Sequence, residues 1–130
     1  MTIRIKHKVR VQIAEDTDMK NLLFSRDDTL SEKIIDAYVR QTSGKFNIAA
    51  SANEDLPFGD ITTVKGMYIE VDQDVQVKLN GSNDAIQLRK SSSTEGVTAQ
   101  MFLEADISQV NVTAGSDAVN GTFCFWGDTS

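Results

Sequence analysis

The residue types that could carry out nucleophilic catalysis are scarce in this sequence. It contains one cysteine, Cys124, and one histidine, His7, near opposite ends of a chain of 130 residues. A cysteine nucleophile needs a base beside it, and histidine is the usual base. Cys124 lies in the apolar run Phe123–Trp126, so we interpret it as a small buried side chain. His7 alternates with Ile5 and Val9, which predicts a partly buried structural histidine.

Acidic residues at close spacing could serve two kinds of site. Glu70 and Asp72 would project from one face of a strand about 7 Å apart, at a rise of roughly 3.3 Å per residue, and glycosidases use carboxylates at such separations. Asp72 and Asp74 could contribute to a calcium site, but the segment lacks the glycine and terminal glutamate of a helix-loop-helix motif. Acids on the wet face of a strand or in a turn are common, so we expect solvated carboxylates.

No segment has the spacing of a phosphate-binding loop. The eight glycines are scattered, without a Gly-Lys-Ser or Gly-x-Gly-x-x-Gly arrangement. A single cysteine also excludes an internal disulfide framework and a multi-cysteine metal site. We therefore expect a protein that is not an enzyme, with no catalytic residues, no cofactor and no bound metal.

The most unusual cluster of charge is basic and lies near the start of the sequence. Its four residues stand at every second position: Arg4, Lys6, Lys8 and Arg10. No acidic residue precedes Glu15. Like charges at this spacing repel one another unless an anionic partner lies beside them. Three partners are open: the acidic remainder of another copy, nucleic acid, and solvent alone on a protected edge strand. The net charge of −6 and the absence of interleaved aromatics oppose nucleic acid, and we predict a protein interface at these four residues.

Length and composition indicate one folded domain over residues 1–130. The hydrophobic fraction of 40% and the charged fraction of 25% are typical of globular proteins. The length fits a single domain. No apolar run approaches the roughly 20 residues that span a bilayer, and the first residues alternate instead of building a signal-peptide core. We expect no membrane partner and no export by a signal peptide.

An apolar side chain at every second position predicts strands throughout the chain. Residues 3–13 read as one long strand with one face on a core and one in water. Residues 67–72 and 75–80 would form a hairpin through Asp72–Asp74, with Val71 opposite Val75. Further short strands are predicted at residues 22–24, 47–49, 85–89, 99–104, 110–113 and 122–126.

Residues 30–41 fit two structures. Thr29–Glu32 has the spacing of a helix capping box, and Leu30, Ile34 and Tyr38 would share a helical face. The same segment also alternates as a strand, with a turn at Thr42–Gly44. We favour the strand, because neighbouring strands supply pairing partners that override weak helix propensity. Leu56–Asp60, which holds the only proline, reads as a loop between two halves of the fold.

Four segments of the chain carry a resemblance to a known group of proteins: residues 59–72, 75–81, 101–103 and 110–113. In them the sequence resembles small β-sandwich virion proteins of tailed bacteriophages, and the likeness extends over nearly the whole chain. The resemblance implies an all-β, antiparallel, jelly-roll-like sandwich of about eight strands with at most one short helix. It brings no catalytic residues.

The function that the resemblance implies is that of a non-enzymatic structural protein of the phage particle. We expect a capsid decoration or cement protein that binds its own copies and the major capsid protein or another virion protein. It would be made in the host cytoplasm and reside in the virion. The alternatives are a neck or tail component, and a carbohydrate- or receptor-binding module.

Overall fold

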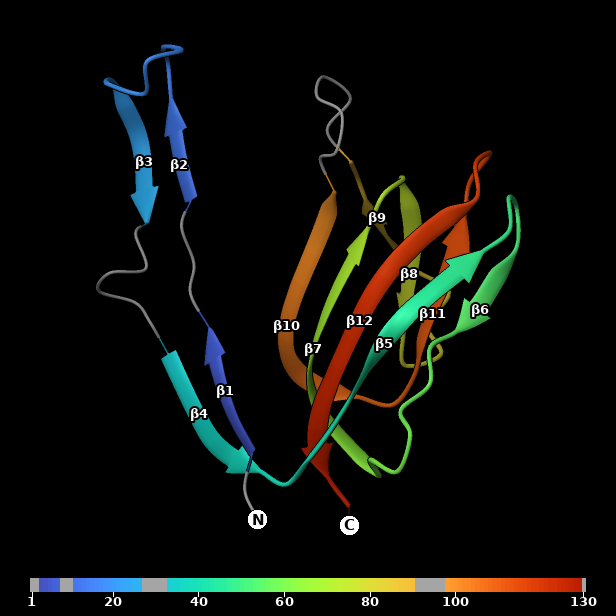
Figure 1. Ribbon diagram of the computed structural model, residues 1–130. Helices are drawn as coiled ribbons and strands as arrows, with labels where there is room; N and C mark the ends of the chain where they lie inside the picture. Colours follow the sequence, from blue (N-terminus) through green and yellow to red (C-terminus); the bar gives the residue numbers. More distant parts are fainter. Residues whose placement is uncertain (1–2, 8–10, 27–32, 91–97, 130) are drawn as a thin grey trace. The chain divides into compact units, whose positions relative to one another are not determined.

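The computed structural model describes residues 3–7, 11–26, 33–90 and 98–129 (Figure 1). These residues form twelve strands, and none of them lies in a helix. The chain divides into two units, residues 1–38 and residues 39–130. The expectation of an all-β protein is therefore confirmed for the described part of the chain.

The first unit contains two antiparallel strand pairs. β1 (Ile3–His7) pairs with β4 (Lys33–Tyr38), and β2 (Val11–Ala14) pairs with β3 (Leu22–Arg26). The two pairs are nested in the order of a hairpin, and residues 8–10 and 27–32, which connect them, lie outside the described residues. We call β2, β3 and the turn between them the tip hairpin. The strand alternative is confirmed for residues 33–38, while Thr29–Glu32 lies outside the described residues.

The second unit consists of two four-stranded antiparallel sheets. The first sheet has the order β5 (Arg40–Ile48), β12 (Val119–Asp128), β7 (Thr63–Val71) and β10 (Ala99–Ile107). The second has the order β6 (Asn53–Asp55), β11 (Val110–Ala114), β8 (Val75–Leu79) and β9 (Ala85–Leu88).

The pairing in these sheets is that of a jelly roll. The first strand of the unit pairs with the last, β6 pairs with β11, β7 with β10, and β8 with β9. This is a hairpin of four successive pairs rolled into a sandwich. The expected sandwich is confirmed, and its strands all lie within residues 40–128. That residues 1–130 make up one domain stays a prediction.

One buried cluster joins the two sheets. Alternate residues of β7 and β12 point into it from the first sheet, and alternate residues of β8 and β11 point into it from the second. Its central members are fully buried: Met67, Ile69, Val71, Val77, Val110, Val112 and Phe125. Because a single apolar cluster draws on both sheets, the sheets pack face to face.

The predicted hairpin between residues 67–72 and 75–80 is wrong. β7 pairs with β10 and β12, whereas β8 pairs with β9 and β11, so the two strands lie in different sheets. Val71 and Val75 are both buried, because Asp72–Asp74 carries the chain across the core from one sheet to the other. Alternation identifies the buried face of a strand but not its sheet, and a hairpin and this crossing have the same sequence pattern.

The predicted turn at Thr42–Gly44 is also wrong, because these residues lie inside β5. Gly44 pairs with Phe123 and Thr42 pairs with Phe125, so pairing with the last strand overrides local turn propensity. The predicted loop at Leu56–Asp60 is confirmed.

Candidate functional site

The predicted basic interface lies on the first strand. Arg4 and Lys6 are exposed on β1, while Ile3 and Ile5 on the other face are partly buried, as the alternation predicts. Lys8 and Arg10 lie outside the described residues. The structure thus places two of the four basic side chains on one exposed strand face, and a protein partner for them stays a prediction.

A second surface, which the sequence did not predict, lies on the tip hairpin. Val11 and Ile13 were expected to lie on a core, and this prediction is wrong. Large apolar side chains of this hairpin are exposed instead: Val11 44%, Ile13 53%, Met19 43%, Leu22 44%, Leu23 65% and Phe24 53%. A two-stranded ladder has no second layer of its own to cover its apolar face.

The strand register places three of these side chains on one face. Ile13 pairs with Phe24, and Val11 lies two residues from Ile13 on the same strand. The opposite face carries Gln12, whose Nε2 donates a hydrogen bond to Ser25 Oγ at 3.4 Å, and the pair Ala14 and Leu22. We call Val11, Ile13 and Phe24 the apolar hairpin face. In the sequence Val11 and Ile13 have the same alternation as the residues of a buried strand, so alternation gave no signal that they would be exposed.

The turn of the tip hairpin is held by its own hydrogen bonds. The Asp16 carboxylate accepts the backbone N–H groups of Lys20 at 3.1 Å and Asn21 at 2.9 Å. The N–H of Asn21, followed by that of Lys20, lowers the pKa of Asp16 below its ordinary value. Met19 adopts a positive φ of 58° in the same turn. The ionised carboxylate therefore orders the turn that presents the apolar hairpin face.

The structure gives no support for a cysteine nucleophile. Cys124 lies on β12 between the core residues Phe123 and Phe125, so its side chain faces the outside of the sheet, where it is partly buried. Its burial raises the pKa of the thiol. Its described polar neighbour is Gln41, whose Oε1 accepts from Sγ at 4.0 Å. His7 belongs to β1 of the other unit, and its side chain lies outside the described residues.

Of the carboxylates that were expected to be solvated, Asp74 is exposed, Glu70 and Asp72 are partly buried, and all three also accept hydrogen bonds. Each accepts a donor from another part of the sandwich: Glu70 from Thr98 Oγ1 at 2.8 Å, Asp72 from Asn120 N at 2.8 Å and Asp74 from Lys90 N at 2.7 Å. These acids therefore tie loops and strands together. Within the described ranges no group of three or more His, Cys, Asp or Glu side chains could hold a metal ion.

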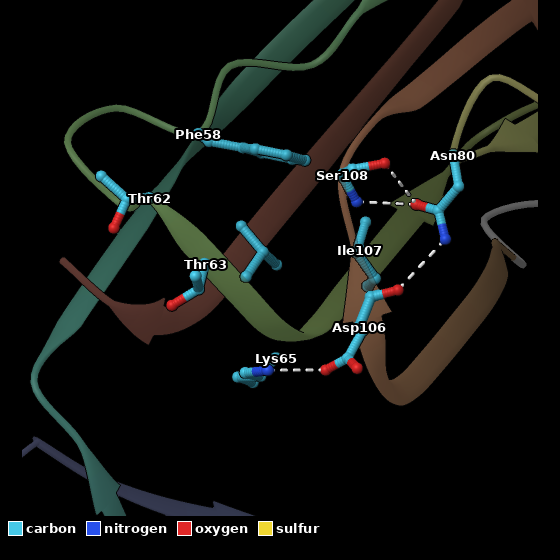
Figure 2. Close-up of a pocket in the computed structure, with 9 residues that line it drawn as sticks. Phe58, Thr62, Thr63, Lys65, Asn80, Asp106, Ile107 and Ser108 are labelled. Carbon is cyan, nitrogen blue, oxygen red and sulfur yellow. Dashed lines mark hydrogen bonds and ion pairs between the residues drawn. The ribbon is translucent and has the colours of Figure 1, made fainter. Parts of the chain in front are cut away.

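A pocket of about 360 Å³ lies where β7 begins and where β8 and β10 end (Figure 2). Figure 2 shows that its polar groups bind one another: Lys65 Nζ lies 2.7 Å from Asp106 Oδ1, and Asn80 Oδ1 accepts from Ser108 N at 2.7 Å. Asn80 Nδ2 also donates to the Asp106 carbonyl at 3.1 Å. These contacts connect the strand ends to one another. They explain the polar lining of the pocket as structural.

Trp126 does not offer a platform for sugar stacking. It lies on the outer face of its sheet, outside the core cluster, yet it is only 3% exposed. Its ring lies against Gly66, where an added Cβ would be 2.3 Å from the indole, and 5.6 Å from the ring of Phe102. The carbohydrate alternative needs an accessible aromatic face, and this tryptophan does not supply one.

No protein-family model matches the sequence, and no curated protein matches it. Among the described residues there is no helix that is long and apolar enough to cross a membrane.

Proposed function

We propose that this chain is a non-enzymatic structural protein of a tailed-bacteriophage particle, acting as a capsid decoration or cement protein. The observation that carries the proposal is a jelly-roll sandwich joined to a hairpin unit whose large apolar side chains are exposed. Jelly rolls form many viral capsid domains. Exposed apolar patches on a folded chain mark surfaces that bind other proteins.

Segregated charge supports assembly with other chains. Residues 39–130 hold six basic and twelve acidic residues, whereas residues 1–14 hold four basic and no acidic ones. Complementary charge sets the orientation of partners and makes their association dependent on salt. The partners in this proposal are further copies of the chain and the major capsid protein or another virion protein, with the particle as the location.

The proposal is tested on purified particles of the phage that encodes the chain. We expect mass spectrometry to find the protein in the particle. Purified protein should also co-sediment with particles of a mutant phage whose genome lacks its gene. This binding should weaken at high salt. Absence from the particle together with no binding to the deleted particles would overturn the proposal.

Copy number separates the placements within the particle. A shell decoration protein occupies equivalent sites of the symmetric shell, so its copy number is a fixed ratio to that of the major capsid protein, whereas the copy number of a neck or tail component does not follow the shell symmetry. The carbohydrate alternative predicts that added glycans quench the fluorescence of Trp126. Because that ring is 3% exposed, we expect no quenching.

A further inference from the structure

We infer that the open edge of β5 binds the same edge of a second copy of this chain, so that two antiparallel β5 strands join their sheets into one. The inference rests on the proposed function and deepens it, because it names a surface through which the copies associate. A twofold axis perpendicular to the sheet makes this contact isologous. It also keeps the two sandwich cores on the same side of the joined sheet.

β5 is an edge strand with a neighbour on one side. It pairs with β12 residue for residue from Arg40 to Ile48, without a register shift. No other strand of the described residues pairs with it (Figure 1). Along an antiparallel strand, alternate residues direct their N–H and C=O groups to opposite sides. About half of the backbone groups of β5 therefore face away from the sheet, where they can pair with another strand.

The other edges of the sandwich are protected against such pairing. β6 and β9, the edges of the second sheet, have three and four residues. β10, the other edge of the first sheet, has a register shift against β7 between Glu104 and Ile107. Short strands and bulges are devices that prevent edge pairing. β5 has nine residues and an unbroken register, so it is the edge of the described sandwich that is best suited to accept a strand.

Charge on the outer face of β5 selects the register with a second copy. Gly44 is the middle residue of β5, so pairing it with Gly44 of the other copy gives full overlap. This register places Lys45 opposite Ser43, and both side chains are exposed, without a hydrogen bond or ion pair to another described residue. A register centred on Lys45 would place like charges directly opposite, which is destabilising. The register centred on Gly44 avoids this repulsion.

The inner face of β5 complements itself in the same register. Thr42 and Phe46 point to the core side of the strand, and both are partly buried in a single copy. With Gly44 at the centre, Thr42 of each copy lies opposite Phe46 of the other. Pairs of a β-branched and an aromatic residue stabilise antiparallel strands. Because both faces of β5 match in one register, the strand favours a second copy as its partner.

The central experiment measures self-association of the full chain by sedimentation velocity over a range of concentrations. We expect a dimer that dissociates on dilution. Ser43→Lys creates two lysine pairs across the twofold axis and should weaken association about 10-fold. Ser43→Glu places a carboxylate opposite Lys45 and should strengthen association. Gln100→Lys and Gln100→Glu make the same changes at an exposed position of β10 and should leave association nearly unchanged.

Circular dichroism and Trp126 fluorescence check that every variant keeps a folded sandwich. A chain that is monomeric at all concentrations would overturn the inference. So would equal effects of Ser43→Lys and Gln100→Lys, because association would then not depend on the edge at which the charge is placed.

Amide hydrogen exchange identifies the surface that associates. The β5 amides that bond to β12 should be protected at every protein concentration. The alternate amides face the open edge, and their exchange should slow as the concentration rises, because pairing gives them acceptors. Association through the tip hairpin would not protect these amides. A chain that self-associates while exchange throughout β5 is independent of concentration would overturn the inference.

Disulfide formation tests the register. Cys124 is the only cysteine, so a Cys124→Ser background removes the native thiol. In that background a mixture of Ser43→Cys and Lys45→Cys chains should form a disulfide between the two variants under mild oxidation, because directly opposite residues are within reach. Each variant alone should form far less, since its cysteines would be diagonal neighbours about 7–8 Å apart. Disulfides mainly between identical variants would overturn the register centred on Gly44.

The outcomes separate this inference from the proposed function. A monomeric chain that binds particles would overturn the inference and leave the function standing, because the copies would then be held by a shell protein alone. A chain that pairs through β5 but is absent from particles and does not bind them would support the inference and overturn the function.

Discussion

The two units of this molecule use the same kind of strand with opposite results. In the sandwich Phe125 is 0% exposed, because the apolar faces of two sheets cover each other. In the tip hairpin Phe24 lies on a two-stranded ladder and is 53% exposed. An amphipathic strand therefore supplies only one of the two layers that a buried core requires. Whether it becomes interior or interface depends on whether the same chain supplies the covering layer.

The largest expected difference between the units is the loss of folding stability when an aromatic side chain is removed. Phe125→Ala should lower the free energy of unfolding of the sandwich by about 3–5 kcal/mol, because it leaves a cavity in a closed core. Phe24→Ala should change it by no more than about 0.5 kcal/mol, as at an exposed position. Urea unfolding followed by circular dichroism at low protein concentration measures both. Equal losses would mean that the hairpin belongs to the sandwich core.

A smaller effect is expected where sandwich strands approach closely at the backbone. A Cβ on Gly127 would lie 2.0 Å from the Thr63 carbonyl oxygen, and a backbone atom cannot rotate away. Gly127→Ala should lower the free energy of unfolding by about 1–3 kcal/mol. Gly115→Ala is the matched control, because the nearest atom to its Cβ is 4.0 Å away. A neutral Gly127→Ala would contradict the close packing of β12 on β7.

Substitutions in the turn of the tip hairpin should change the stability of the hairpin alone. Asp16→Ala removes the acceptor for two backbone N–H groups and should speed amide exchange in β2 and β3 without changing unfolding of the sandwich. Asp18→Ala, in the same turn, is the control and should leave the exchange rates nearly unchanged.

The stability of the same turn should depend on pH. The folded pKa of Asp16 is lowered, so its stabilising effect is complete above its unfolded pKa and is lost as the pH falls through the folded pKa. Protection of the wild-type hairpin amides, taken relative to their intrinsic exchange rates at each pH, should therefore fall at acid pH, whereas Asp16→Ala should lack this fall. A pH response that survives in Asp16→Ala would assign it to another group.

The smallest expected effect concerns thiol reactivity. Burial raises the pKa of Cys124, so less thiolate is present at any pH below that value and alkylation should be slow. In the Cys124→Ser background, Leu23→Cys places a thiol at the most exposed apolar position of the hairpin and should react faster. Alkylation rates measured against pH for both proteins test this. A faster Cys124 would mean that its surroundings in the sheet open in solution.

Much of the strand content and of the buried face could be predicted from the sequence. Residues 67–71 and 75–79 alternate strictly, and the residues expected on the apolar side are the ones that the core buries. Alternation is a local property, because successive side chains of a strand point to opposite faces. The basic face of β1 was predicted for the same reason.

Which strands pair with one another could not be predicted from alternation. β5 contains Thr42–Gly44, a segment of turn-forming residues, because β12 from the far end of the chain pairs with it. The apolar hairpin face was missed because Val11 and Ile13 have the same pattern as buried strand residues. Both depend on contacts between parts of the chain that are distant in sequence, which alternation does not encode.

The sequence by itself determined that this chain is built of amphipathic strands, which side of each strand is apolar, and where basic and acidic residues are concentrated. The tertiary structure decided that β7 and β8 face each other across a core instead of pairing, and that the last strand pairs with the first strand of the sandwich. In the tip hairpin large apolar side chains are exposed. The physical reason is that burial requires a second layer, and the position of that layer is set by contacts between distant parts of the chain.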